Sequence, residues 1–312
     1  MTSPVQVLRT VFYTIALFGL TGVLNAVQIL SLPIALFSER TMYELNSKLV
    51  RIVWITMQLI FERVNQGRIT FSGHKLPRGE SAFVISNHLS WADFYLLHSL
   101  SIRRGMIGYC RYFVKDSLKW LPFYGWGMWI MGMIFLKRDW QRDQRKINLA
   151  FGQIRRLNPP IQLISFLEGS RATPKKLHES QLYAKSHDLP VLKNVLLPRT
   201  KGFISTVKAL RGTNIKHVYD FTIAYKHETL GFGHPPSVQR VHQPRISPEY
   251  ECHVHVRRYS VDELPQDDAG LNQWVRDRFV EKDALLEQMR TAWPKEGDDF
   301  DGTEVYTEAL KF

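Results

Sequence analysis

Two residues with complementary acid–base chemistry, His88 and Asp93, lie five positions apart just after the apolar run at residues 82–85. The apolar run predicts a buried strand. Five residues of a regular helix turn through about 500°, which would point the two side chains well apart. We therefore place His88 on a strand-to-helix turn and Asp93 in the first helical turn, from where its carboxylate can reach one imidazole nitrogen. A histidine held in this way, with its other nitrogen free, suits a general base acting on a hydroxyl group.

The same residues also fit a purely structural role. Ser90-Trp91-Ala92-Asp93 follows the Ser-x-x-acid pattern of a capping box, in which the acid satisfies a backbone N–H group at the start of a helix. The segment by itself does not separate the two roles, so both stay open at this point.

A second group of polar residues, Glu168-Gly169-Ser170-Arg171, follows another predicted strand. A glycine allows backbone N–H groups to approach a ligand closely, and the planar fork of donors on Arg171 matches phosphate oxygens. Glu168 is expected to hold the Arg171 guanidinium in place. The alternative is a plain turn that carries a solvated Glu/Arg pair.

Two further strand ends carry cations. Lys137 and Arg138 follow one strand, and Pro198 and Arg199 precede a helix start. Pro198 has no N–H group and ends strand pairing, while cations at a helix N-terminus favour anion binding. Solvated charges at ordinary connections are the alternative for both segments.

Residues 115–134 are rich in aromatic side chains and glycine, among them Trp120, Trp126 and Trp129. An acyl-chain groove, contact with a membrane and a packed core all fit this composition. The pair His253 and His255 would share one face of a strand, but no third and fourth ligand have suitable spacing nearby, so we expect no metal site.

Short apolar segments that alternate with amphipathic ones predict an α/β fold with a mixed sheet flanked by helices. We expect strands at residues 82–86, 106–113, 133–136, 162–167, 195–197, 217–225 and 251–259. Helices are expected at residues 91–100, 116–120, 144–157, 175–187, 203–211 and 271–291.

The N-terminal region is strongly apolar, with no charged residue at positions 11–37. That length is enough to cross a hydrocarbon core of about 30 Å, although Asn25, Gln28 and Pro33 predict a broken or tilted helix. The second apolar stretch, residues 52–61, would complete a shallow hairpin or lie in the interface. Core helices of a soluble protein are the alternative. We expect three regions: an anchor at residues 1–65, a main domain at 66–260, and a polar helix with a loose acidic tail at 261–312.

The charge is unevenly distributed. Residues 103–216 contain 22 Lys/Arg and 6 Asp/Glu, whereas residues 262–308 contain 5 and 14. The middle of the chain is therefore suited to anionic partners. No basic run accompanies a nucleic-acid-binding motif, so nucleic acid is not an expected partner. With only Cys110 and Cys252, the chain has no disulfide framework, which is typical of a reducing compartment.

Four segments in order resemble the four sequence blocks of the glycerolipid acyltransferases, in particular the 1-acylglycerol-3-phosphate and lysophospholipid branch. They are Asn87-His88-(four residues)-Asp93, Phe135-Leu136-Lys137-Arg138, Phe166-Leu167-Glu168-Gly169-Ser170-Arg171 and Leu197-Pro198-Arg199-Thr200-Lys201-Gly202-Phe203. The segment from Trp274 to Asp283 is also similar to that branch. The chain departs from the pattern at Leu167, where the family commonly has Pro, and at Ser170, where it often has Thr.

The resemblance implies a membrane-bound enzyme that transfers an acyl group from acyl-CoA to a lysophospholipid hydroxyl, with lysophosphatidate or lysophosphatidylinositol as the expected acceptor. His88 and Asp93 would be catalytic, and the substrate-binding residues would be Lys137, Arg138, Glu168, Gly169, Ser170, Arg171, Pro198 and Arg199. The resemblance implies no cofactor and no metal, contact with membrane lipids, and location in the endoplasmic reticulum with a cytosolic catalytic face. The rival interpretations are a membrane-tethered lipid-binding protein of the same fold without catalysis, and an enzyme that uses another acceptor such as water.

Overall fold

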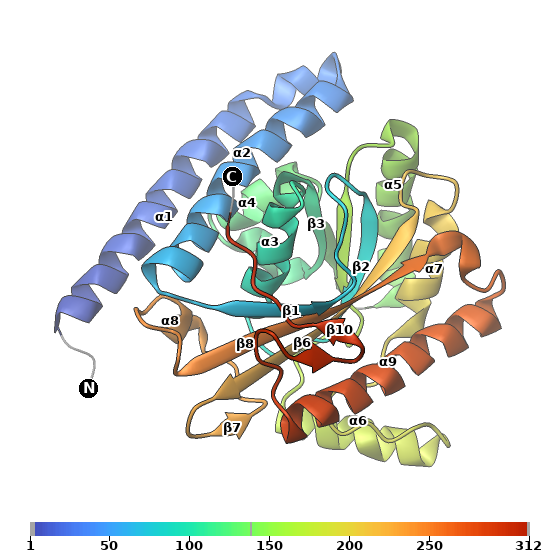
Figure 1. The fold of residues 1–312 in the computed structure, drawn as a ribbon. Helices are drawn as coiled ribbons and strands as arrows, with labels where there is room; N and C mark the ends of the chain where they lie inside the picture. Colours follow the sequence, from blue (N-terminus) through green and yellow to red (C-terminus); the bar gives the residue numbers. More distant parts are fainter. Residues whose placement is uncertain (1–3, 138, 311–312) are drawn as a thin grey trace.

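A central eight-stranded sheet organises the computed structural model, which describes residues 4–137 and 139–310 (Figure 1). The predicted site residue Arg138 lies outside the described residues. Seven strands follow the order β1-β8-β6-β2-β5-β3-β4, and the short β7 pairs with β6. The pairs β6–β8 and β6–β7 are antiparallel, whereas all other pairs are parallel. The predicted mixed α/β architecture is therefore confirmed.

The strands of this sheet are β1 (Ile69–Gly73), β2 (Ala82–Ser86), β3 (Cys110–Lys115), β4 (Ile134–Leu136), β5 (Gln162–Phe166), β6 (His217–His227), β7 (Gly231–Phe232) and β8 (Tyr250–Ser260). The α-helices are α1 (Pro4–Leu30), α2 (Glu39–Leu59), α3 (Asp93–Arg103), α4 (Tyr124–Ile130), α5 (Trp140–Leu157), α6 (Pro174–Ser186), α7 (Thr200–Leu210), α8 (Val238–Val241) and α9 (Asp268–Thr291). Shorter helical turns are η1 (Leu32–Leu36), η2 (Ile60–Val64), η3 (Ile107–Tyr109), η4 (Asp116–Trp120) and η5 (Val261–Glu263).

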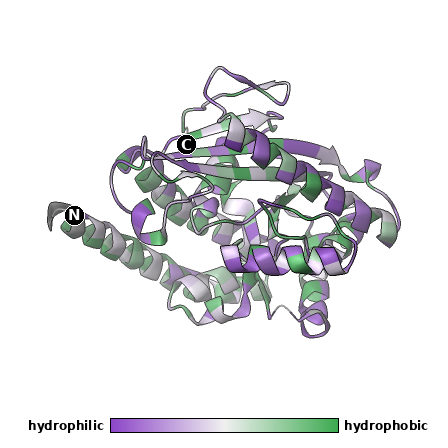
Figure 2. Ribbon diagram, turned by 90° about the horizontal axis from the view of Figure 1, so that it is seen from below, coloured by the Kyte–Doolittle hydropathy of each residue, from purple (hydrophilic) through white to green (hydrophobic). Residues whose placement is uncertain are grey.

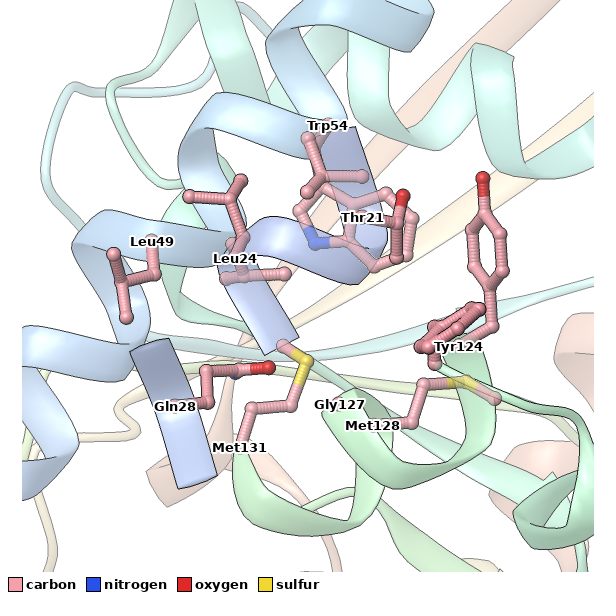
Figure 3. Close-up of a pocket in the computed structure, with 12 residues that line it drawn as sticks. Thr21, Leu24, Gln28, Leu49, Trp54, Tyr124, Gly127, Met128 and Met131 are labelled. Atoms are coloured by element: carbon pink, nitrogen blue, oxygen red, sulfur yellow. The ribbon is translucent and has the colours of Figure 1, made fainter. Parts of the chain in front are cut away.

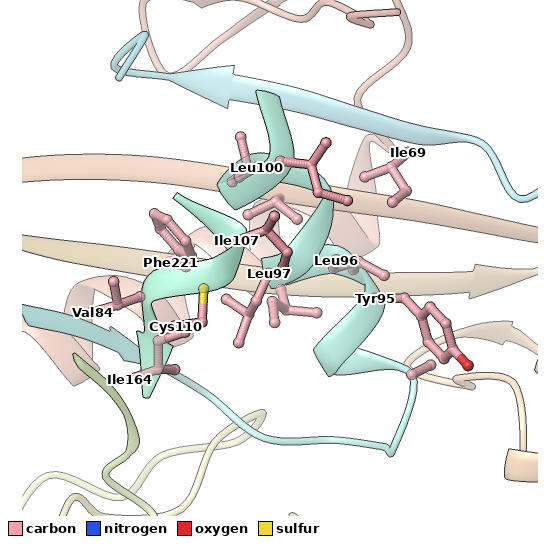
Figure 4. Packing of buried hydrophobic residues seen from close by; sticks show 14 of the residues in the cluster. Ile69, Val84, Tyr95, Leu96, Leu97, Leu100, Ile107, Cys110, Ile164 and Phe221 are labelled. Carbon is pink, nitrogen blue, oxygen red and sulfur yellow. The ribbon is translucent and has the colours of Figure 1, made fainter. Parts of the chain in front are cut away.

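Each face of the sheet is covered by its own hydrophobic core, because successive strand residues point to opposite faces. Val84 of β2 belongs to the core under α3, whereas its neighbours Phe83 and Ile85 belong to the core under α5, α7 and α9. Figure 4 shows Leu96, Leu97 and Leu100 of α3 packed over the first of these cores. The sheet is thus buried on both sides, and the ends of its strands are where polar side chains can gather.

Most expected elements are present, but one expected strand is absent and another begins later than expected. Residues 195–197 form no strand, because their neighbourhood is held by other groups: the Leu197 N–H donates to Ser180 Oγ (3.0 Å) and the Arg199 N–H donates to Leu167 O (2.8 Å). Residues 107–109 form the helical turn η3 before β3 begins at Cys110. The edge strand β1 was not predicted at all.

The expectation of a loose acidic tail is also wrong. The short pair β9 (Asp299–Phe300) and β10 (Thr303–Glu304) is followed by Tyr306, which exchanges two backbone hydrogen bonds of 2.8 Å with Phe71 of β1. Val305 beside it is fully buried. The few apolar residues of the tail thus cover the edge of the sheet, which would otherwise present unpaired backbone groups.

The N-terminal apolar segment is broken where the sequence predicts a break, since α1 ends at Leu30 and η1 contains Pro33. The second apolar stretch, residues 52–61, forms the end of the longer amphipathic helix α2 and the start of η2. Because α2 packs beside α1, the two helices form a hairpin, which is one of the expected alternatives; its place relative to a membrane stays a prediction. The polar residues of α1 are used in packing: Gln28 donates to Asn46 of α2 (2.9 Å). By length and composition, residues 8–36 include a helix that could cross a membrane, and only 28% of its most apolar window is buried.

Candidate functional site

The predicted contact between His88 and Asp93 is present. The turn after β2 carries His88, α3 begins at Asp93, and His88 Nδ1 lies 2.7 Å from Asp93 Oδ2. Because a carboxylate only accepts hydrogen bonds, Nδ1 carries the proton and Nε2 is left with a free lone pair. The His88 side chain is 15% exposed, whereas that of Asp93 is fully buried. The pair therefore presents one basic nitrogen at the surface of the site.

Asp93 is held by more donors than His88 alone. Its Oδ2 also accepts from the N–H groups of Leu89 (2.7 Å) and Ser90 (3.0 Å), and its Oδ1 accepts from the Tyr225 hydroxyl (2.7 Å). The bond from the Ser90 N–H to Asp93 matches one half of a capping box, whereas Ser90 Oγ accepts from the Ala92 N–H (3.2 Å) and α3 begins at Asp93. The catalytic and the capping interpretations are thus compatible, because one carboxylate orders the turn and also holds the imidazole.

The position of the His88 ring is fixed from two sides. Phe166, the last residue of β5, stacks on the ring with centroids 4.0 Å apart and planes at 19°, and Phe94 contacts it edge-on at 6.3 Å. The preceding residue, Asn87, exchanges hydrogen bonds of 2.8 and 2.9 Å with both backbone groups of Ile223 on β6. The turn is therefore attached to both strands that flank β2.

Glu168 does not pair with Arg171, which corrects our expectation. The Glu168 side chain is buried, Arg171 is exposed, and in the described part of the chain neither carboxylate oxygen of Glu168 has a hydrogen-bond partner of good geometry. Burial raises the pKa of Glu168 well above its ordinary value, and the Asp93 carboxylate raises it further. Lys282 and the N–H groups of His88 and Leu196 act in the opposite direction. Glu168 therefore behaves as a buried acid behind the His88 turn.

Gly169 and Arg199 come together beside this acid. Gly169 has φ of 70°, and a Cβ atom added there would lie 2.6 Å from Arg199 Nε. A residue with a Cβ atom would be strained by the left-handed backbone, and the exposed Arg199 side chain would have to move to make room. The Ala172 N–H donates to His88 O (2.7 Å), so the turn that carries Gly169 is tied directly to the turn that carries His88.

The other predicted binding residues lie around this centre at different depths. Pro198 is buried, Ser170 is partly exposed, and Arg171 and Arg199 are exposed. Lys137 is exposed at the end of β4, and its backbone N–H donates to Asp143 Oδ1 (2.9 Å). In the described structure no hydrogen bond or ion pair joins Lys137 to the segments around His88, so its place in one common site stays a prediction.

A family model described as Acyltransferase matches residues 68–226, and a second model described as Acyltransferase C-terminus matches residues 247–308. The chain belongs to the acyltransferase family. It is 37% identical over 211 residues to 1-acyl-sn-glycerol-3-phosphate acyltransferase 2 of Arabidopsis thaliana, which covers 67% of this chain and 52% of that protein.

Two further relatives of this acyltransferase-family chain are matched over more of their length. It is 32% identical over 298 residues to 1-acyl-sn-glycerol-3-phosphate acyltransferase 3 of Arabidopsis thaliana (93% of this chain, 75% of that protein). It is 29% identical over 269 residues to lysocardiolipin acyltransferase 1 of Danio rerio (86% and 67%). The chain spans about half the length of several other curated relatives that it matches.

Sequence reasoning did not identify Lys282 of α9 as part of the site of this acyltransferase-family protein. Its ammonium group is fully buried and contacts Asp220 Oδ1 (2.6 Å), Phe221 O (2.7 Å) and Thr222 Oγ1 (3.1 Å), all on β6. Burial lowers the pKa of Lys282, which the Asp220 carboxylate opposes. The signal in the sequence is the position of Lys282 three residues after Phe279 and three before Leu285, on the apolar side of the helix.

Tyr225 was also missed, because its contact with Asp93 joins segments 132 residues apart. Burial, followed by the neighbouring Asp93, raises the pKa of Tyr225 well above its ordinary value. Its hydroxyl therefore stays protonated and donates to Asp93. Together, Asn87, Tyr225 and Lys282 make β6 the strand to which the residues around His88 are attached.

His253 and His255 share a face of β8, as predicted. Ser72 Oγ lies 2.8 Å from His253 Nε2 and 2.8 Å from His255 Nδ1. Burial lowers the pKa of His253 to about 3 and that of His255 to about 4, so both rings are neutral near pH 7. Within the described residues no group of three or more His, Cys, Asp or Glu side chains is arranged to hold a metal ion.

Proposed function

We propose that this protein transfers a fatty acyl group from acyl-CoA to a hydroxyl group of a lysophospholipid. The observation that carries the proposal is the free Nε2 of His88, whose opposite nitrogen is fixed by the buried Asp93. The relatives of the chain support the reaction class, since their names state acylation of 1-acyl-sn-glycerol-3-phosphate and of lysocardiolipin. We expect lysophosphatidate and lysophosphatidylinositol to be the preferred acceptors.

In the proposed reaction, His88 Nε2 takes the proton of the acceptor hydroxyl while the hydroxyl oxygen attacks the thioester carbonyl carbon. A new C–O bond forms, the C–S bond breaks, and the departing thiolate receives the proton from Nε2 to give the free thiol of coenzyme A. Asp93 keeps the ring in the correct tautomer and stabilises its charged form. The acceptor itself is the nucleophile, so the step uses no covalent intermediate with the protein.

The acceptor must be held with its hydroxyl within hydrogen-bond distance of Nε2. Arg171 and Arg199 are exposed cations on the two segments that surround Gly169, and we assign them to the phosphate of the acceptor. Ser170, Lys137 and Arg138 would add to this binding site. Such positioning supplies a large part of the rate enhancement in reactions between two bound substrates.

We further propose that the protein is attached to a membrane through α1 and that its site faces the cytosol at the endoplasmic reticulum. The exposed apolar residues of α1 support attachment, for example Phe12 and Ile15. Figure 2 shows hydrophobic colouring recurring along the ribbon of the helix that begins near the N-terminus. The cysteines Cys110 and Cys252 are buried and free, which suits a domain in a reducing compartment.

The test is acyl transfer by the purified full chain in detergent with labelled acyl-CoA. Lysophosphatidate, lysophosphatidylinositol, lysocardiolipin and lysophosphatidylcholine are offered separately, and at least one is expected to be acylated. His88→Ala should lower the turnover about 10²–10⁴-fold, because a positioned general base contributes about that much. His74→Ala, at an exposed histidine, is the matched control. Retention of most activity by His88→Ala would overturn the assignment of the base.

A further inference from the structure

Five side chains between β3 and β4 form an exposed apolar surface that the proposed reaction does not use. This aromatic platform consists of Trp120, Leu121, Phe123, Trp126 and Trp129. Trp120 is 74% exposed and Trp129 is 63% exposed. Single exposed apolar residues are normal on a soluble protein, but a contiguous cluster of large ones marks an interaction site.

The platform is continuous with α1, about 100 residues away in the sequence. A Cβ atom added to Gly22 would lie 3.8 Å from the Phe123 ring, and the rings of Phe18 and Tyr124 are 5.3 Å apart. An open groove of about 490 Å³ runs between them and is lined by Ile15, Phe18, Val23 and Phe123, among others. The exposed face of α1 and the platform therefore form one apolar surface.

The packing around α4 fixes this surface relative to the rest of the domain. A small cavity is lined by Thr21, Leu24 and Gln28 of α1, by Trp54 of α2 and by Met128 of α4, so the three helices meet there (Figure 3). At the other end of α1, Arg9 Nη2 donates to Val64 O (2.8 Å). The helix is therefore attached to the domain at Arg9 and again between Thr21 and Gln28.

This attachment limits how α1 can meet a bilayer. Leu24, in the middle of the apolar segment, lies level with Leu49 and Val50 of α2, and α2 exposes Lys48 and Arg51 at the same level. If α1 crossed the hydrocarbon core, these two charges would be carried to its centre, where charged side chains are strongly disfavoured. An orientation with α1 in the interfacial plane leaves both charges near water.

The platform also lies near the carboxyl ends of the parallel strands, where His88 follows β2. In the strand register, Tyr112 pairs with Ile164, and the next residue, Phe113, pairs with Ile134. Residues 116–133, which carry the platform, therefore leave β3 after Lys115 and enter β4 at the level of the end of β5. The turn that carries Glu168 begins at the same level. Tryptophan is enriched at membrane–water interfaces. The nearby Lys119, whose Nζ lies 5.2 Å from the Trp120 ring centre, pairs with Asp116 (2.8 Å), which also pairs with Lys146 (3.2 Å). These three side chains keep one excess positive charge, which suits anionic headgroups.

We propose that the aromatic platform is a second bilayer contact. Together with the exposed face of α1, it holds the strand ends around His88 against the lipid surface. The inference rests on the proposed function, since an acceptor that resides in the bilayer must reach His88. A contact of this kind fixes the orientation of the site as well as its distance from the membrane.

The test places a nitroxide spin label on the full-length chain at Trp120→Cys or Trp129→Cys, with Leu149→Cys and Leu182→Cys as exposed apolar controls on α5 and α6. The native cysteines are buried and should remain unlabelled. On equimolar phosphatidylcholine–phosphatidate vesicles, labels at 120 and 129 should become accessible to oxygen and protected from an aqueous nickel complex, while the controls stay unchanged. Labels at 120 and 129 that remain accessible to nickel on vesicle-bound protein would overturn the proposal. Protection that rises with protein concentration in the absence of vesicles would also overturn it, because the occupant would then be a second copy of the chain.

A turnover measurement separates this proposal from the reaction itself. The double variant Trp120→Ala/Trp129→Ala should lose at least tenfold of its turnover on acceptor embedded in vesicles and stay within twofold on a short-chain acceptor below its micelle concentration. The control Leu149→Ala/Leu182→Ala should match the unmodified chain in both assays. An equal loss on both acceptors would contradict a role at the membrane. Absence of turnover in the unmodified chain would refute the proposed function but leave the label result valid.

Discussion

Asp93 and Glu168 are two buried carboxyl groups of one site with opposite surroundings. Asp93 accepts hydrogen bonds from His88, from two backbone N–H groups and from Tyr225. Neither oxygen of Glu168 has such a partner in the described structure, and burial raises the pKa of Glu168 well above its ordinary value. Burial alone therefore does not define the role of an acid. The hydrogen-bond donors around Asp93 allow it to hold the imidazole of His88. Glu168 lacks such donors and therefore favours its neutral form.

The largest effect is expected from Asp93→Asn, which keeps the shape of the side chain and replaces the carboxyl group by an uncharged amide. An amide can present an N–H group to His88 Nδ1 and then favours the wrong tautomer, so we expect kcat to fall about 10³–10⁴-fold. Thermal unfolding checks that the variant is folded. A loss of less than tenfold in a folded variant would contradict the role of Asp93.

The second test removes Lys282, the buried cation that opposes the raised pKa of Glu168. Lys282→Met leaves Asp220 buried and unpaired, so the free energy of unfolding should fall by about 3–5 kcal/mol in urea titrations. Asp220→Asn combined with Lys282→Met should restore most of it. The matched control is Lys208→Met, which breaks a pair of 2.7 Å with Asp268 whose side chains are 53% and 66% exposed, and it should cost about 0–1 kcal/mol. Equal effects at both lysines would contradict the distinction.

Glu168→Gln tests the raised pKa through the pH dependence of stability. A folded chain with a raised pKa keeps its proton after the unfolded chain has released it, so the free energy of unfolding falls as pH rises above about 4.5. Each unit by which the pKa of Glu168 in the folded chain exceeds its pKa in the unfolded chain contributes about 1.4 kcal/mol. The Gln variant lacks this slope. Its stability relative to the unmodified chain should therefore increase from pH 4 to pH 8, as measured by urea midpoints. A pH-independent difference would mean that the pKa of Glu168 is not raised.

The smallest effect is expected from Tyr225→Phe. This change removes one of the four donors to Asp93 and leaves the ring packing in place, so kcat should fall about two- to tenfold, which corresponds to about 0.5–1.5 kcal/mol, the contribution of a typical single hydrogen bond. The Michaelis constant for the acceptor should stay unchanged, because Tyr225 is fully buried and its hydroxyl group donates to Asp93. A fall larger than that of Asp93→Asn would show that Tyr225 acts directly on the substrate.

The local part of the site could be predicted from the sequence, and the distant part could not. His88 and Asp93 belong to one turn, so spacing and helix geometry are enough to place Asp93 beside the imidazole. The turn that carries Glu168 was located correctly, but the burial of its side chains was not predicted. The sequence places Glu168 and Arg171 three residues apart and does not show which of the two side chains is buried. Burial decides that, and burial depends on segments far away in the chain.

The same limit explains the errors in the fold. The strand β1 was missed because its partners, β8 and Tyr306, follow it by more than 180 residues. Residues 195–197 have the composition of a strand, but Ser180 and neighbouring segments take their backbone groups. Lys282 looked like one charge on a polar helix, although its position relative to Phe279 and Leu285 already placed it on the buried side.

The pairing of β1 also has a consequence for the order of events during synthesis. Both segments that complete the hydrogen bonds of the strand follow it by more than 180 residues and therefore leave the ribosome much later. Until those residues emerge, β1 stays open on both sides and can pair with another chain. Closure of this edge by the acidic segment around Tyr306 is therefore a late step of folding. A nascent chain that stalls before it would present its earliest strand as a template for aggregation.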